Sequence, residues 1–149
     1  MTTKRQQIMT ALDTRLEAIS SESESPTYNT DLGNSIHEWK ATPFQDSDLP
    51  GLDYRDINDV ITEASGSRHR HDLTVQMDIL FSGSTAPTTM RKLIQDVMTA
   101  INVDPTWGGL ALHTYPVSNE SIEIEQAGKK IGGVRLNIVI VFITNAWET

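Results

Sequence analysis

The chain has no cysteine among its 149 residues. Without thiols it can form no disulfide, no thiolate metal site and no cysteine nucleophile, and this absence fits a reducing compartment. No apolar run approaches the ~18 residues that a membrane-spanning helix needs, and the basic N-terminus is not followed by an apolar segment of signal-peptide length. We therefore expect a soluble, cytosolic protein that makes no contact with membranes.

Basic residues are also scarce, because 12 lysines and arginines stand against 20 aspartates and glutamates, which gives a formal net charge of -8. This excess argues against a nucleic-acid-binding surface that depends on phosphate contacts. DNA can still pass near a negatively charged surface without binding to it. The length favours a single domain over residues 1–149, large enough to bury a core without disulfides.

The common catalytic motifs are missing too. The pairs Gly108-Gly109 and Gly132-Gly133 lack the strand, loop and helix setting and the lysine that a phosphate-binding loop requires, so turns explain them better. No Gly-x-Ser-x-Gly elbow for a serine nucleophile occurs. The sequence therefore contains no recognisable nucleophile or phosphate site, and we predict no catalytic residue and no cofactor.

Metal binding has three candidate sets of ligands. His69 and His71 share one face of a strand, but no third ligand can be named beside them. Carboxylates supply the other two sets, which are Asp53, Asp56, Asp59 and Glu63, and Glu120, Glu123 and Glu125. On a strand, the three-residue spacing of the aspartates places them on opposite faces, and Glu123 and Glu125 fit the outward half of an alternating strand. A solvated acidic surface is the favoured interpretation, and we predict no metal site.

The closing stretch, residues 132–144, commits more apolar surface to one geometry than any other segment does. In a strand its side chains alternate between two apolar faces, with Leu136, Ile138, Ile140 and Phe142 on one and Val139, Val141 and Ile143 on the other. A strand with two apolar faces needs cover on both sides. The pattern leaves open whether one of the two covers is a second copy of the protein.

Elsewhere the periodicity predicts two helices and several strands. The helices are expected over residues 3–19 and 87–101, the second capped by Ser84 or Thr85. A hairpin is expected between residues 28–30 and 36–39, with further strands over residues 52–63, 68–81, 110–115 and 121–126. A turn at residues 127–130 leads into the closing strand. This order predicts an α+β fold: a largely antiparallel mixed sheet with an N-terminal helix, strands, a second helix and a long C-terminal hairpin.

The lengths of the elements add a constraint. The closing strand would extend roughly 43 Å, whereas the helix over residues 87–101 covers only about 22 Å. Either the strands bend sharply or a two-stranded arm overhangs the domain, and an exposed arm would be a place for subunits to join. We predict subunit contacts from Val139, Val141 and Ile143, or from Arg68, His69, Arg70 and His71. Replacing Val141 by Asp is expected to give stable monomers that do not assemble.

Several segments, in chain order, carry a resemblance to a known family. They are the N-terminal helix, YNTDLG at 28–33 leading to Trp39, DLPGLD at 48–53 with Arg55-Asp56, LIQDV at 93–97 followed by Ala100-Ile101, DPTWGGL at 104–110, Glu125-Gln126, and the closing strand with Trp147 after it. Read together, these segments resemble the tail terminator, or tail completion, proteins of long-tailed bacteriophages and prophages. The resemblance spans nearly the whole chain and includes no catalytic signature.

The resemblance implies a structural virion protein. Such proteins assemble as a hexameric ring on the head-proximal end of the tail tube, where the ring stops tube polymerisation and presents the surface to which the head connector docks. The implied partners are other copies of the chain, the tail tube protein and the head connector or neck protein, with DNA passing through the channel without specific binding. The implied location is the host cytoplasm during assembly and then the virion tail.

Three other functions stay open. Another phage neck or head-closure component would have the same composition and no chemistry, and binding to tail tubes as opposed to head connectors would separate the two. A small metal-dependent hydrolase would bind divalent cations tightly and lose activity when Asp56 or His71 is replaced. A monomeric peptide-binding module would not self-associate at all.

Overall fold

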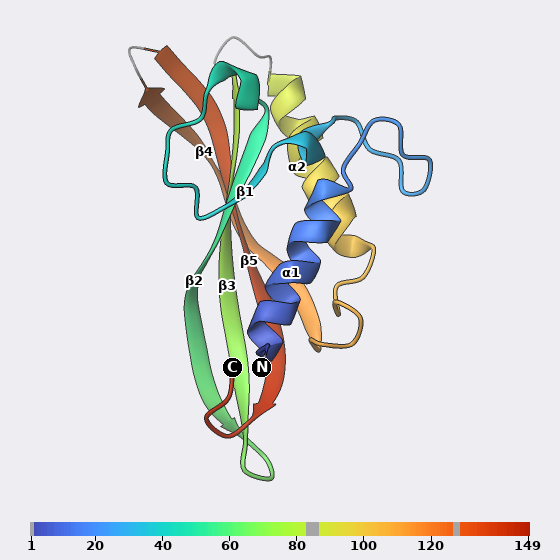
Figure 1. Cartoon of the computed structure of the whole chain (residues 1–149), viewed down its shortest axis with the longest axis vertical. Helices are drawn as coiled ribbons and strands as arrows, with labels where there is room; N and C mark the ends of the chain where they lie inside the picture. Colours follow the sequence, from blue (N-terminus) through green and yellow to red (C-terminus); the bar gives the residue numbers. More distant parts are fainter. Residues whose placement is uncertain (1, 83–86, 127–128) are drawn as a thin grey trace.

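The computed structural model describes residues 2–82, 87–126 and 129–149, which form one mixed sheet with two helices on one of its faces (Figure 1). Five strands lie in the order β1-β2-β3-β5-β4, and all neighbours are antiparallel except the parallel pair β1 and β2. The elements are α1 (Lys4–Glu17), β1 (Ile36–Glu38), β2 (Gly51–Ala64), β3 (Arg68–Ser82), α2 (Pro87–Asn102), β4 (His113–Gln126) and β5 (Lys129–Asn145), with short 3-10 helices at Leu32–Asn34 and Asp46–Asp48. This arrangement confirms the predicted α+β fold.

The core lies between the helices and the central strands β3 and β5. Apolar residues of β3 pair across the ladder with those of β5: Leu73 with Ile140, Val75 with Ile138, and Met77 with Leu136. Cross-strand partners share a face of the sheet, so these side chains form one continuous apolar surface. The helices cover that surface with their own apolar stripes: Ile8, Leu12 and Leu16 from α1, and Leu93, Val97 and Ile101 from α2. The side-chain oxygen of Thr3 caps α1 by accepting a hydrogen bond from the backbone N–H of Gln6.

The long strands are covered by two helices that follow one another along the sheet, and this explains how strands longer than either helix can be buried. In Figure 1, α1 covers the half of the sheet where β3 begins and α2 the half where β3 ends. Helices of 14 and 16 residues extend roughly 21 and 24 Å, which together approach the ~50 Å of a 15-residue strand. β3 and β5 pair along the whole of β3, from Arg68 with Asn145 to Ser82 with Ile131. Long strands are therefore matched without a long two-stranded arm.

The predicted hairpin between residues 28–30 and 36–39 is wrong. β1 instead pairs in parallel with β2, and residues 28–30 bond to helix α2. Asp96 of α2 is buried, and its carboxylate accepts hydrogen bonds from the backbone N–H groups of Asn29 and Thr30, each at 2.8 Å, and from both of their side chains. The Asp96 carboxylate thus accepts the backbone hydrogen bonds of residues 29 and 30 that a neighbouring strand would accept in a hairpin.

Two details of the C-terminal half also differ from expectation or lie outside the described residues. The strands expected over residues 110–115 and 121–126 are one strand, β4, which begins at His113 and has a bulge between Pro116 and Ser118. Ser84 and Thr85, the predicted cap of α2, lie outside the described residues, as do residues 127–128 of the predicted turn.

The segments that carry the family resemblance contact one another in space. Residues 28–33 meet residues 93–97 through Asp96, and Gly33 lies so close to the end of α1 that an added Cβ would overlap the carbonyl oxygen of Glu17. The guanidinium of Arg15 lies 5.2 Å from the centroid of the buried Trp107 ring. These segments therefore fasten the helices to the connecting loops, which is a structural role.

Candidate subunit interface

The face of the sheet opposite the helices is covered over only part of its length. Around Leu80 and Ile131, Phe44 and Leu49 from the loop of residues 41–50 close a small second core on this face. Along residues 70–74 of β3, neither helix nor this loop covers it. We call this part the open sheet face; by cross-strand pairing it comprises Asn58, Val60, Thr62, Arg70, Asp72, Thr74, His113, Tyr115, Val139, Val141 and Ile143.

The closing strand contributes Val139, Val141 and Ile143 to the open sheet face. Val141 is 0% exposed and Val139 is also buried, whereas Ile143 is half-buried. His113 and Tyr115 lie beside them on β4, with their rings stacked at 5.5 Å between centroids. Val141 thus has no surface to offer a neighbouring subunit. The stable monomer expected from Val141→Asp does not follow, because that substitution would bury a carboxylate.

The first residues of β3 differ in their exposure to solvent. Arg68 and Arg70 are exposed, and the Nε of Arg70 lies 2.9 Å from a carboxylate oxygen of Asp72. His69 is half-buried, and its Nδ1 accepts a hydrogen bond from the backbone N–H of Trp147 at 3.3 Å. His71, by contrast, is fully buried. The predicted subunit contact stays a prediction for Arg68, His69, Arg70 and Ile143, and His71 is removed from it as a direct contact.

Exposed apolar side chains that the sequence-based prediction did not name also lie on and beside the open sheet face. Val60 of β2 is 53% exposed, and Tyr115 and Val117 of β4 are exposed as well. Val60, Asp72 and Val141 follow one another in a single row across three strands. Val117 is the extra residue of the β4 bulge. Sequence periodicity gives no sign of this bulge, so only the structure places Val117 at the sheet edge.

His71 joins three strands from inside the sheet. Its Nδ1 lies 2.8 Å from Asp59 Oδ2 on β2, and its Nε2 lies 2.9 Å from the hydroxyl of Thr144 on β5. The imidazole also stacks on Phe142, with 4.6 Å between the ring centroids. Buried polar groups of this kind are hydrogen-bonded because an unpaired one would be costly. His71, predicted from the sequence as a subunit contact, is therefore a packing residue inside the sheet.

A bulge at Ile57, between the paired residues Asp56 and Asn58, determines which face of β2 each aspartate lies on. Because the bulge adds one residue, Asp56 and Asp59 lie on the same face, contrary to the expectation from spacing. Both are near Arg5 of α1, with Nη2 at 2.7 Å from Asp56 and Nη1 at 3.8 Å from Asp59. Burial raises the pKa of Asp56, but hydrogen bonds from the Trp39 indole and from Arg5 outweigh it and hold the pKa below its ordinary value.

The acidic sets do not converge on a common centre. Asp53 lies on the opposite face, where its carboxylate accepts hydrogen bonds from the Lys40 backbone N–H and the Arg55 side chain, each at 2.8 Å. Glu120 pairs with Arg135 in the ladder between β4 and β5, and the side chains of Glu123 and Glu125 lie outside the described residues. Within the part of the chain that the structure describes, no three acidic or histidine side chains are grouped as metal ligands.

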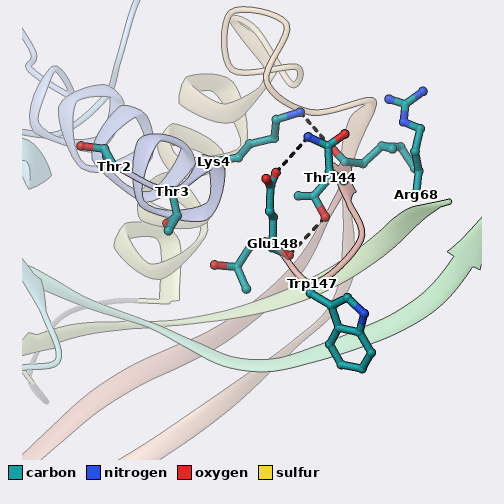
Figure 2. A pocket seen from close by; sticks show the side chains of 10 residues that line it. Thr2, Thr3, Lys4, Arg68, Thr144, Trp147 and Glu148 are labelled. Atoms are coloured by element: carbon teal, nitrogen blue, oxygen red, sulfur yellow. Dashed lines mark hydrogen bonds between the residues drawn. The ribbon is translucent and has the colours of Figure 1, made fainter.

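Two of the clefts in the described part of the chain lie beside β5 or β4. The first, about 470 Å³, lies where both chain ends meet β5 and is lined by Thr2, Lys4, Arg68, Asn145, Trp147 and Glu148 among others (Figure 2). The second, about 280 Å³, lies between α2 and β4 and has a mostly apolar lining.

No protein-family model matches the chain, and no curated protein is significantly similar to it in sequence. Among the described helices, none has both the length and the apolar character that crossing a membrane would require. The resemblance of short segments and the surfaces described above are therefore the observations that bear on the function of the chain.

Proposed function

We propose that the chain is the subunit of a ring that caps the head-proximal end of a phage tail tube. The ring ends tube polymerisation and forms the docking surface for the head connector. The segments that resemble tail terminator proteins support this function, and so does the distribution of apolar surface over the sheet.

The open sheet face carries the proposal. Its accessible apolar side chains are the half-buried Ile143 of β5, the exposed Tyr115 of β4 and, across β3, Val60 of β2 at 53% exposure, and they surround the buried Val139 and Val141. Sheet faces with apolar residues and no covering layer are suited to contact with another protein. In a closed ring each subunit contacts the next through two unlike surfaces, and the open sheet face supplies one of them.

The edge strands of the sheet are built in a way that discourages subunits from pairing before they reach the tail tube. β4 has no strand on its outer side in the described part of the chain, and β2 has none beyond Tyr54, where β1 ends. Both edges carry features that discourage uncontrolled strand pairing, since β4 has Pro116 and the Val117 bulge and β2 has the Ile57 bulge. Assembly then depends on a specific surface and not on edge pairing.

The net charge of -8 also suits a ring through which DNA passes. Carboxylates facing a channel repel phosphate groups, and this repulsion keeps the transported DNA from binding to the wall. A strongly basic chain would favour the opposite behaviour.

The test is the mass of the purified protein by light scattering over a concentration series, with and without assembled tail tubes. We expect either a closed ring in solution or a monomer that forms rings only on tube ends. A monomer that ignores tube ends at every concentration would contradict the proposal. Binding to isolated head connectors but not to tubes would instead favour a neck or head-closure protein.

A further inference from the structure

Trp147 is the large apolar side chain that the fold buries least. Its side chain and backbone together are 94% exposed, and in Figure 2 the indole points away from the other labelled side chains. A single exposed apolar residue needs no explanation by itself. The residues around Trp147, however, are fixed on both sides, and this is unusual for a segment that carries no buried side chain of its own.

Hydrogen bonds hold the segment after β5 in place. The Trp147 N–H donates to His69 Nδ1 at 3.3 Å, and the Thr144 hydroxyl donates to the Glu148 carbonyl at 3.2 Å. The Lys4 N–H at the start of α1 donates to the Thr149 carbonyl at 3.0 Å. Trp147 has a φ of 64°, in the left-handed region that costs a residue other than glycine about 1 kcal/mol or more. These bonds hold the backbone of the segment in place, and the indole points outward with an edge contact to the His69 ring, at 5.8 Å between the ring centroids.

A pocket that could accommodate the indole of a tryptophan lies elsewhere on the same chain. We call it the α2–β4 pocket; it has a volume of about 280 Å³ and an apolar lining from Met98, Ile101, Pro105, Pro116 and Ile138. Its volume suits one aromatic side chain and is below the usual range for pockets that bind small molecules. Asn102 lines the same pocket and is exposed, so its amide oxygen is available to accept the indole N–H.

We infer that Trp147 of one copy inserts into the α2–β4 pocket of the next copy. The occupant comes from another molecule because the chain's own Trp147 is held near the starts of α1 and β3, where its N–H bonds His69 and the Thr149 carbonyl bonds Lys4. A fixed aromatic anchor is typical of residues that dominate an interface, since little conformational freedom is lost when it binds. Anchor and pocket are unlike surfaces, so repetition of the contact closes a ring or extends a filament.

This inference rests on the proposed ring and names one of its contacts. The absence of cysteine from the chain allows a direct test with two single-cysteine variants that both keep Trp147. They are Glu148→Cys, at an exposed residue next to Trp147, and Asn102→Cys in the pocket, one of them enlarged by a fusion tag. The two are mixed at concentrations, or on tail tubes, at which the wild type assembles, and are joined with a short bismaleimide. We expect a crosslinked pair that contains both variants. Ser25→Cys, in an exposed loop, replaces Asn102→Cys as the control and should give none.

A second measurement uses the association itself. Trp147→Ala should weaken self-association roughly 30-fold or more, as expected for an interface anchor, and Trp147→Phe should weaken it less. If the wild type forms rings while Trp147→Ala associates equally well and no mixed crosslink appears, the inference is overturned and the ring stands. If the mixed crosslink forms but only in filaments that ignore tube ends, the contact stands and the terminator function is overturned. A wild type that never self-associates overturns both.

Discussion

The two faces of β5 have similar sequences and different surroundings. On one face Ile138, Ile140 and Phe142 lie under the helices and belong to the main core. On the other, Val139 and Val141 are buried although no helix lies over them, and the exposed Val60 stands in the same row as Val141. Residues of the same chain bury the first face completely, whereas on the second face they bury only the central residues Val139 and Val141. Burial on the second face therefore depends on neighbouring strands and, at its margin, on a partner.

The same comparison explains which polar groups each face tolerates. Beside the helices, the buried His71 is satisfied by Asp59 and Thr144, and Asp96 by the segment of residues 28–30. On the open sheet face the polar contact is the Arg70 and Asp72 ion pair, which is largely solvated. Exposed pairs of this kind contribute little to stability. Stability should therefore respond far more to changes on the helix-covered face.

The largest effect is expected from Phe142→Ala on the helix-covered face. Phe142 is fully buried and stacks on His71 with 4.6 Å between centroids, so its removal leaves a cavity and loosens the histidine. We expect a loss of about 3–5 kcal/mol in the free energy of unfolding. Urea unfolding of the monomer, followed by circular dichroism, measures it. A loss below about 1 kcal/mol would mean that the helices do not close this face.

Val141→Asp tests whether the centre of the open sheet face is truly buried. Val141 is 0% exposed and pairs across the ladder with Asp72. A second carboxylate there would be desolvated and next to a like charge, so we expect a loss of about 3 kcal/mol. Val141→Ala is the control and should cost less, because it introduces no charge. Unchanged stability of the Asp variant would mean that solvent reaches the residue and that the face is open throughout.

Much of this fold follows from the sequence because strand periodicity is strong where one face is buried. The alternation of β3 and β5 predicts their faces correctly, and the stripe of α2 predicts its boundaries to within a residue. The hairpin fails for a different reason. Whether residues 28–30 pair with a strand or with Asp96 depends on a contact 66 residues away in sequence, which local pattern does not contain.

The candidate interface is less predictable, for physical reasons. Alternation shows which side of β5 carries Val141, but exposure depends on the width of neighbouring side chains such as His113 and Tyr115. The bulge at Ile57, which brings Asp56 and Asp59 to one face, leaves no mark in the spacing of the aspartates. Trp147 was part of the resembling segments, yet its outward position depends on hydrogen bonds to His69 and between Lys4 and Thr149.

A smaller effect is expected from acid at the margin of the helix-covered face. The pKa of Asp56 is held below its ordinary value, so this carboxylate stabilises the fold above that value and the stabilisation is lost as the pH falls through the lowered pKa. Asp56→Asn should cost about 1 kcal/mol near neutral pH, reduced by partial solvation. The difference from wild type in urea unfolding should shrink as the pH falls below the ordinary pKa of an aspartate and through the lowered pKa of Asp56. A difference independent of pH would assign the effect to packing instead of charge.

The smallest change in stability is expected from Val60→Asp, at the exposed end of the row that contains Val141. Since Val60 is 53% exposed, the free energy of unfolding should change by no more than about 0.5 kcal/mol. A carboxylate at this point of the open sheet face would nevertheless be desolvated whenever a partner covers that face, so ring formation or capping of tail tubes should fail. Thr62→Asp, one row further toward the hairpin tip, maps the limit of the contact. If Val60→Asp assembles like the wild type, then the open sheet face is solvent-exposed in the assembly, and the ring contacts lie elsewhere.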